Sequence, residues 1–266
     1  MADMARPADR LSRRGFLTLT AAGLAAALST PIALADNGKP VGSADNGKLI
    51  DFTHLQVPVD QVVAAGYTGV IVYVSELRPG ATFDFKPVSR GYTDALRAAG
   101  LHVVSVYQYG KPGWVNSPSD FTRGFDGGVA DARTALRLHG AAGGPDTAPI
   151  FFSVDEDISA DTWKNVALQW FKGINSVLGV QRTGIYGGAR QVTWAADDGV
   201  IGRSTTPGHR WAWQTRAWSG GARAPMAVLY QATVVTASDP GTMIGDFHVD
   251  EDDILAADYG QWDLAR

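Results

Sequence analysis

Short runs rich in β-branched and aromatic residues recur along this chain, and they alternate with patterns typical of amphipathic helices. The runs expected to form strands are 48–52, 69–74, 102–108, 149–155, 183–187, 210–215, 227–231 and 246–250. Helical patterns fall between most of them, at 58–65, 88–99, 118–139, 159–178 and 188–197. We therefore predict an α/β fold, a single (β/α)8 TIM-like barrel. Its last units should be reduced, because the connections after the sixth and seventh strands look like loops.

A doubly wound open sheet is the main alternative for such an alternation. Many sheets of that kind bind a dinucleotide through a G-x-G-x-x-G turn, which this chain lacks. The segment GIYGGAR, residues 184–190, does cluster glycines, but a turn that opens a helix explains them without a phosphate. The barrel is therefore the preferred architecture.

The first 35 residues have the features of an export signal. Arg13 and Arg14 precede an alanine-rich apolar run, and the run ends at Ala35 in an A-x-A cleavage pattern. This segment resembles the twin-arginine export signal, although Thr18 stands where Lys or Arg often closes that motif. We therefore expect recognition by the twin-arginine export machinery, cleavage after Ala35, and a secreted or cell-wall-associated product.

The apolar run is too short and too rich in Ala, Gly and Thr for a stable spanning helix, and no later segment offers about 18 unbroken apolar residues. No membrane contact is expected after cleavage of the signal, 1–35, and an uncleaved amino-terminal anchor is the alternative. Residues 36–47 are rich in Gly, Pro, Asn and Asp, as flexible linkers are. The barrel domain should therefore occupy 48–266.

Composition narrows the classes of function. The chain has no cysteine, so an exported fold must be held by its core, without disulfides. The formal net charge of −4 gives no sign of the basic patch that nucleic-acid binders usually carry. We therefore expect an ordinary globular domain with no nucleic-acid partner.

Acidic residues stand at the ends of three predicted strands: Asp51, then Asp155 with Asp157, and Asp250. Side chains alternate along a strand, so Asp155 and Asp157 should point inward together while Glu156 faces outward. Barrel enzymes place their chemistry at the carboxyl ends of the strands, so the four aspartates should ring one cavity. A cap of the following helix is the other explanation for Asp157.

Carboxyl groups crowded into one cavity repel each other, and partial burial adds to the effect. At least one pKa should then rise, which supplies a protonated acid beside ionised partners, as hydrolysis of a glycosidic bond requires. A sugar site also needs flat apolar faces beside amide or hydroxyl groups. Trp211 and Trp213 are expected in the core. The candidate substrate contacts are Tyr73, Gln108, Tyr186, Gln214, Trp218 and Gln231.

The chain resembles a known family at these residues. The features concerned are Asp51, a D-x-D after an apolar fourth strand, Tyr-Gln at 230–231 and Val-Asp on the last strand. Together they are similar to the actinobacterial glycoside-hydrolase-like domain, long described as a domain of unknown function. That group is similar to the family 25 glycoside hydrolases, the lysozymes that cleave peptidoglycan between N-acetylmuramic acid and N-acetylglucosamine. The resemblance covers about residues 48–255 and implies a cell-wall polysaccharide or peptidoglycan as partner.

The resemblance also implies roles for the acids. In the lysozymes the fourth strand ends D-x-E, where the Glu is the general acid and the Asp orients the acetamido group of the substrate. Asp155 and Asp157 hold those positions here, and Asp51 and Asp250 match the other carboxylates. Asp in place of Glu retracts the acid by about 1.5 Å, which can cost on the order of a hundredfold in rate. Glu156 could serve as the general acid only if a bulge at the end of the strand rotated its side chain to the inner face.

Metal and acyl-transfer chemistries have weaker support. His248 shares a strand face with Asp250, and His54 follows Asp51 closely, which keeps a metal-dependent hydrolase as an alternative. No H-E-x-x-H spacing occurs, so no metal or other cofactor is predicted and His248 is expected in the core. Ser219 lies in AWSGG, which lacks the G-x-S-x-G pattern of serine hydrolases.

The sequence thus supports three functions. The first is a retaining-type or substrate-assisted glycosidase acting on an N-acetylated cell-envelope glycan, with Asp157 as acid and Asp155 as orienting group. The second is a binding module that kept the acidic cleft but lost efficient turnover, which the shortened acid favours. The third is a metal-dependent hydrolase, which removal of metal by a chelator would inactivate.

Overall fold

The computed structural model describes residues 47–52, 55–233 and 241–264. The predicted export signal, its cleavage site and nearly all of the predicted linker lie outside the described residues, as does His54. In the described part of the chain, no helix is both long enough and apolar enough to cross a membrane.

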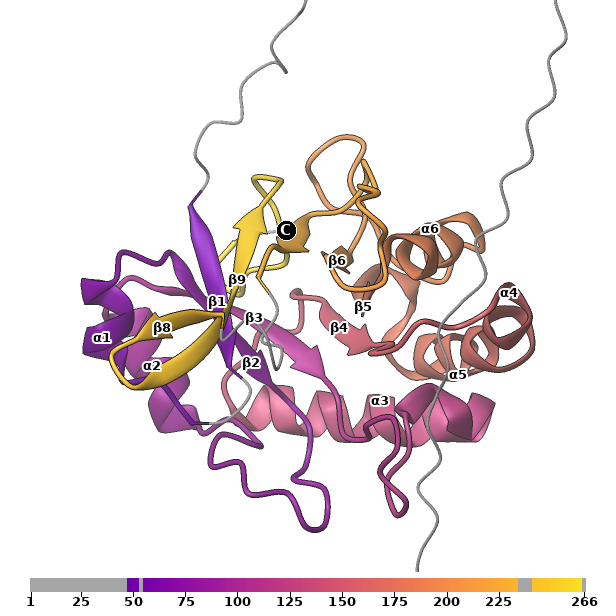
Figure 1. Ribbon diagram of the computed structural model, residues 1–266, viewed down its shortest axis with the longest axis horizontal. Helices are drawn as coiled ribbons and strands as arrows, with labels where there is room; N and C mark the ends of the chain where they lie inside the picture. Colours follow the sequence, from indigo (N-terminus) through magenta and orange to yellow (C-terminus); the bar gives the residue numbers. More distant parts are fainter. Residues whose placement is uncertain (1–46, 53–54, 234–240, 265–266) are drawn as a thin grey trace, which may run out of the picture. The chain divides into compact units, whose positions relative to one another are not determined.

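Eight strands close into a barrel, which confirms the predicted architecture (Figure 1). β1 to β7 follow one another in the sheet, each parallel to the next, and β9 closes the ring between β7 and β1. Each strand overlaps one of the predicted runs. The bounds are β1 Lys48–Phe52, β2 Gly69–Tyr73, β3 His102–Tyr107, β4 Ile150–Ser153, β5 Thr183–Gly187, β6 Ala212–Thr215, β7 Leu229–Gln231 and β9 Phe247–Ile254.

The closing strand runs against its neighbours, which the sequence pattern did not indicate. β9 is antiparallel to both β7 and β1, and a further short strand, β8 Thr242–Ile244, forms a hairpin with β9 outside the ring. The hairpin turn contains Gly245 at a φ of 56°, a left-handed conformation that glycine adopts without strain. A hairpin reverses the chain direction at once, whereas a parallel return needs a crossover of about a dozen residues.

Helices cover the outside of the barrel as far as β6, and no described residue between β6 and β9 is helical, so the reduction of the last units is confirmed. The predicted helix at 118–139 is divided where Gly124 adopts a φ of 59°. The elements are α1 Val59–Ala64, α2 Arg90–Ala98, η1 Asp120–Arg123, α3 Gly124–Ala141, α4 Ala160–Thr162, η2 Trp163–Ala167, α5 Leu168–Leu178, η3 Val180–Arg182 and α6 Ala189–Asp197.

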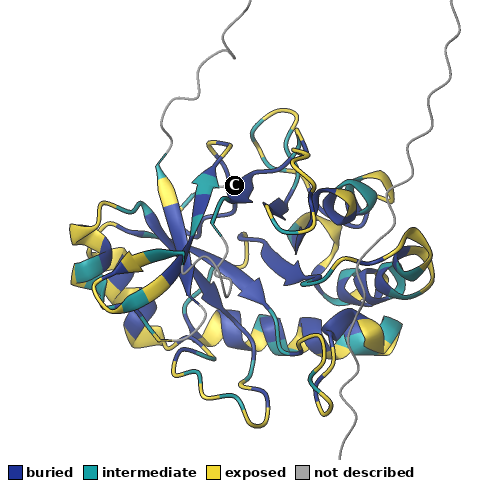
Figure 2. Cartoon of the chain, viewed as in Figure 1, coloured by how far each residue is buried: buried dark blue, intermediate teal, exposed yellow. Residues whose placement is uncertain are grey.

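The barrel strands are buried along most of their length, as Figure 2 shows. Apolar side chains dominate this core, among them Phe151, Phe152, Trp170 and Trp211. The exceptions are buried acidic residues of β1 and β9. Burial of a carboxyl group lowers the stability of a fold unless the group is paired or hydrogen-bonded, so the partners of these residues matter.

Candidate active site

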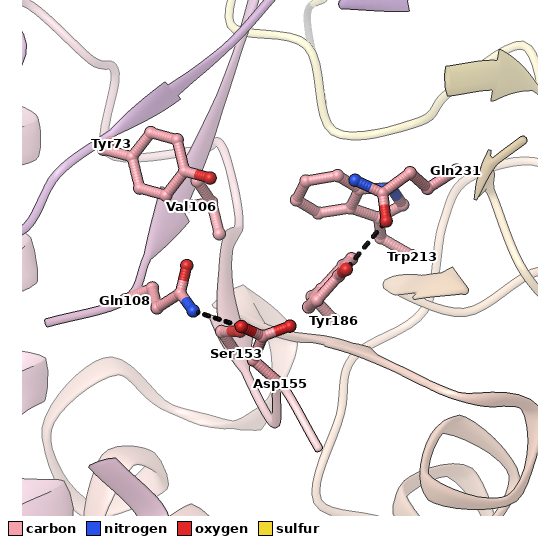
Figure 3. Close-up of a pocket in the computed structure, with 8 residues that line it drawn as sticks. All are labelled: Tyr73, Val106, Gln108, Ser153, Asp155, Tyr186, Trp213 and Gln231. Carbon is pink, nitrogen blue, oxygen red and sulfur yellow. Dashed lines mark hydrogen bonds between the residues drawn. The ribbon is translucent and has the colours of Figure 1, made fainter. Parts of the chain in front are cut away.

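A cavity of about 70 Å³ lies at the mouth of the barrel, where β2 to β7 end (Figure 3). This is the end at which barrel enzymes place their chemistry. It has room for a few water molecules or for a group the size of an acetamido substituent. Five of the predicted site residues come together here. The lining consists of Tyr73, Val106, Gln108, Ser153, Asp155, Tyr186, Trp213 and Gln231.

Asp155 is the acidic residue that lines this cavity. It follows the end of β4 at Ser153, and Gln108 holds it by a hydrogen bond of 2.9 Å from Nε2 to Oδ2. Burial raises the pKa of Asp155, whereas the Gln108 hydrogen bond and the charges of Lys111 and Lys86 act in the opposite direction. Asp155 therefore combines access to the cavity with a raised pKa.

A chain of hydrogen bonds connects the cavity to deeper carboxylates. The Tyr186 hydroxyl donates to Oε1 of Gln231 over 2.7 Å, as drawn in Figure 3. Nε2 of Gln231 donates to Asp51 over 3.0 Å and to Asp250 over 3.1 Å. The Tyr73 hydroxyl also reaches Asp51, at 3.4 Å. Gln231 therefore separates Asp51 and Asp250 from the cavity while binding both of them.

Asp51 and Asp250 stand opposite each other in the antiparallel pairing of β1 and β9, and both are buried. Burial and then the charge of Asp250 raise the pKa of Asp51 well above its usual value. At least one raised pKa was predicted from the crowding of the strand-end acids, and Asp51 provides it, with burial as the larger cause.

Asp252 is a third buried carboxylate, which the sequence analysis missed. One of its oxygens accepts a hydrogen bond of 2.7 Å from Trp213 Nε1, and the other has no partner. Burial, followed by the charge of Asp51, raises the pKa of Asp252 well above its usual value. The signal was present in the sequence, because Asp252 is two residues beyond Asp250 and alternation places both on one face.

The predicted inward pair of Asp155 and Asp157 is wrong. β4 ends at Ser153, so strand alternation does not extend over residues 154–157. Asp157 is exposed and forms an ion pair with Arg190 of α6, outside the cavity. Glu156 accepts a hydrogen bond from Ser119 and does not line the cavity either. Asp157 does not cap the helix, because Ser159 holds that position and accepts from the Thr162 amide over 3.0 Å.

Two predicted substrate contacts also lie away from the cavity lining. Gln214 is buried, and its amide donates to Ser219 and to the Ala222 carbonyl, while its Oε1 accepts from the Ala224 amide. It therefore stabilises the loop that follows β6. Trp218 lies in that loop with a φ of 57° and is 40% exposed. Trp213, predicted as core, is buried and also forms part of the cavity wall.

Ser153 is a further residue that lines the cavity. Its hydroxyl is buried and has no hydrogen-bond partner. In Figure 3 it lies beside Asp155 at the floor of the cavity. A buried hydroxyl without a partner costs free energy, which a polar group of a ligand or water in the cavity would recover.

The described residues contain no group of three His, Asp or Glu side chains arranged to hold a metal ion. His248 is exposed, so its predicted core position is wrong: β9 extends there beyond the ring and pairs with β8. Ser219 is used structurally, because its hydroxyl donates to the Thr215 carbonyl over 2.6 Å and accepts from the Ala189 amide over 3.0 Å.

A closed α/β barrel with a raised-pKa carboxyl group in its mouth and amide and phenol groups around it has the site architecture of a glycoside-hydrolase-type protein. The family model of the Rv2525c-like, glycoside hydrolase-like domain matches residues 60–254. The chain belongs to this family, which confirms the resemblance found in the sequence.

Individual relatives agree with this assignment. The chain is 34% identical over 255 residues to Rv2525c of Mycobacterium tuberculosis, to which a peptidoglycan hydrolase activity is ascribed; the match covers 95% of this chain and 99% of the relative. The crystal structure of that Tat-secreted protein in complex with L-tartrate superposes with a TM-score of 0.72 and 36% identity, covering 81% of this chain and 98% of the other. The modular autolysin LytC of Streptococcus pneumoniae shares the fold, with a TM-score of 0.50 at 14% identity, over 77% of this chain and 46% of LytC.

Proposed function

We propose that this protein is exported and hydrolyses an N-acetylated glycan of the cell envelope, such as peptidoglycan, at the mouth of its barrel. The observation that carries the proposal is the position of Asp155. It is the carboxyl group in the cavity, its pKa is raised by burial, and hydrogen-bonding side chains surround it. The activity ascribed to Rv2525c supports the choice of polymer.

In this proposal Asp155, and not Asp157, is the proton donor. Asp155 gives its proton to the glycosidic oxygen as the bond between that oxygen and the anomeric carbon breaks. A water molecule then adds to the anomeric carbon as a hydroxyl group. Its remaining proton goes to the Asp155 carboxylate, which restores the acid. The raised pKa keeps part of the Asp155 population protonated at a pH where an ordinary aspartate has lost its proton.

The other side chains of the cavity orient the substrate. Gln108 fixes the Asp155 carboxylate, while Tyr73, Tyr186 and the unpartnered Ser153 hydroxyl offer hydrogen bonds to an acetamido or hydroxyl group. The carboxyl groups of Asp51 and Asp250 accept hydrogen bonds from the Gln231 amide, and they thereby hold the side chain whose oxygen orients the Tyr186 hydroxyl.

The amino-terminal sequence and the relative both support the proposed export. Rv2525c is a Tat-secreted protein, and the match to it covers nearly the whole of both chains. In this proposal the Arg13–Arg14 pair and the alanine-rich run direct the chain to the twin-arginine machinery, with cleavage after Ala35 and release at the cell wall.

Glycan binding without turnover is the second candidate, and one observation favours it. The position that holds the general acid in the family 25 lysozymes is occupied by Asp157, which forms an ion pair with Arg190 outside the cavity. A chain that retains the cavity but has lost this acid would still bind the polymer.

The deciding experiment measures new reducing ends released from purified actinobacterial cell wall by the protein from Asp36 onward. We expect Asp155→Asn to lower release by on the order of 10² to 10⁴, the usual contribution of a general acid. The matched control Asp157→Asn removes an equivalent charge at the exposed ion pair and should retain most of the activity. No release by the wild-type protein, with retained pull-down on the same wall, would establish the binding function instead. Loss with Asp157→Asn alone would refute the assignment of Asp155.

A further inference from the structure

A second cavity, of about 80 Å³, lies directly beside the first at the barrel mouth. The two cavities share Tyr73, Gln108 and Asp155, so a ligand held by Asp155 would extend from one into the other. The remaining lining differs in character from that of the first cavity, because it combines aromatic rings with cations: Phe83, Phe85, Arg78, Lys86 and Lys111.

Arg78 is the most confined of these cations, with 5% of the residue exposed. Its guanidinium carbon lies 5.0 Å from the centroid of the Phe83 ring and 4.8 Å from that of Trp114, and Nη1 donates to the Tyr109 carbonyl over 3.3 Å. Its Nε is buried without a hydrogen-bond partner. A guanidinium keeps its charge in proteins and presents donors in a rigid fork that matches a carboxylate. A buried guanidinium with a vacant donor therefore favours an anionic ligand.

Lys86 provides the second cation. Its ammonium group donates to the Gln108 carbonyl over 3.0 Å and lies 3.9 Å from the centroid of the Tyr73 ring. Burial and then the charge of Arg78 lower the pKa of Lys86 to about 7. The charges of Asp120, Asp155 and Asp51 act in the opposite direction, and an anionic ligand in the cavity would favour the charged form of Lys86 further.

Lys111 completes the wall at its solvent side, where it is exposed. Among the described residues, none of Arg78, Lys86 and Lys111 forms an ion pair with a carboxylate within 4.0 Å. The eight ion pairs of the described chain all involve other residues, so these cations are not used to hold the fold together by such pairs. Asp155 and Asp120 act on this group of cations only at longer range, so an anionic ligand in the cavity could pair with the cations directly.

We propose that Arg78, Lys86 and Lys111 form a subsite for a carboxylate carried by a sugar ring next to the one that Asp155 contacts. The subsite rests on the proposed function in placing this carboxylate on a glycan. The lining favours a carboxylate on a short alkyl substituent over a phosphate, because Phe83 and Phe85 contribute an apolar wall beside the cations. The lactyl ether of N-acetylmuramic acid has this chemistry.

The test compares two probes that differ at one carboxyl group: the disaccharide of N-acetylglucosamine and N-acetylmuramic acid, and its methyl ester, which lacks the negative charge. Calorimetry should show that the wild-type protein binds the free acid about tenfold more tightly than the ester, as for a charge-assisted contact. Arg78→Gln should abolish this preference. Lys111→Gln, at an exposed position that leaves the core intact, should reduce it. Lys172→Ala, which removes an exposed charge from α5, should leave it unchanged.

Equal affinity of the wild-type protein for acid and ester would overturn the subsite, as would a preference that persists in both Arg78→Gln and Lys111→Gln. Tighter binding of N-acetylglucosamine 6-phosphate than of N-acetylmuramic acid would overturn the choice of a carboxylate. Binding of D-lactate without a sugar tests the anion subsite separately from the proposed glycan function. Binding of lactate that depends on Arg78, without binding of either disaccharide, would retain the anion subsite and refute the glycan function, and binding of none of these probes would overturn the subsite as well.

Discussion

Replacement of Asp252 by asparagine should stabilise the protein at neutral pH and above, because it removes a buried charge and keeps the shape of the side chain. Asp252 is fully buried, and one of its oxygens has no hydrogen-bond partner. Burial and the charge of Asp51 raise the pKa of Asp252 well above its usual value. The ionised form therefore costs free energy in the folded protein that it does not cost in the unfolded chain.

The expected gain is the difference between two effects. An asparagine oxygen still accepts the hydrogen bond from Trp213 Nε1, but a neutral acceptor is weaker than a charged one by about 1 kcal/mol. Removing an uncompensated buried charge gains several kcal/mol, limited by the ability of the wild-type carboxyl group to bind a proton instead. We expect a net increase of about 1–3 kcal/mol in the free energy of unfolding at about pH 8.

The pH dependence of the stability gain distinguishes removal of a buried charge from a general packing effect. A carboxyl group whose pKa is raised on folding binds more protons in the folded state, so the stability of the wild-type protein falls as pH rises above the usual aspartate value, 3.8, and through the folded-state pKa. Urea unfolding at about pH 5 and about pH 8 should therefore show a larger gain for Asp252→Asn at the higher pH. Asp253→Asn, on the opposite and partly exposed face of β9, is the control. An equal gain at both pH values, or a loss of stability, would refute the argument.

Two further predictions concern stability. The pKa of Lys86 falls on folding from 10.5 to about 7, so the wild-type protein should gain stability as pH rises between these values, and Lys86→Met should lack that gain in paired urea titrations. Gly173→Ala should cost about 1–3 kcal/mol by overpacking, because a Cβ there would lie 2.0 Å from the Phe125 carbonyl oxygen at the contact of α5 with α3. Gly140→Ala, at an exposed and open position of α3, should instead stabilise by about 0.5–1 kcal/mol, and thermal unfolding that ranks the two variants otherwise would contradict this account.

The barrel could be predicted from the sequence because its signal is repeated. Each run of β-branched and aromatic residues is short, but eight runs separated by helical patterns leave few architectures open. The direction of β9 could not be predicted in the same way. It depends on whether the chain returns through a hairpin or a crossover, and β8 is only three residues long.

The candidate site could be predicted only in part, for reasons of geometry. Tyr73, Tyr186 and Gln231, predicted as substrate contacts from their residue types, do line the cavity, because each lies within a regular strand. Strand alternation failed at Asp157, because β4 ends four residues earlier and the Asp157 side chain pairs with Arg190. The cationic subsite escaped notice, since its three cations lie in two loops and have no shared spacing.

Gln231 is the residue through which the buried carboxylates influence the cavity. Its amide donates to Asp51 and Asp250, and its oxygen accepts from the Tyr186 hydroxyl, so the amide fixes the orientation of that phenol in the cavity. Gln231→Leu should therefore weaken binding of the disaccharide acid about tenfold, the equivalent of one strong hydrogen bond, and should also destabilise the fold. Gln214→Leu removes a comparably buried amide that supports only a loop, so it should lower stability and leave the affinity unchanged. Calorimetry of both variants at a temperature where both are folded measures the difference. Unchanged affinity in Gln231→Leu would mean that the acids beneath the cavity do not act through this amide.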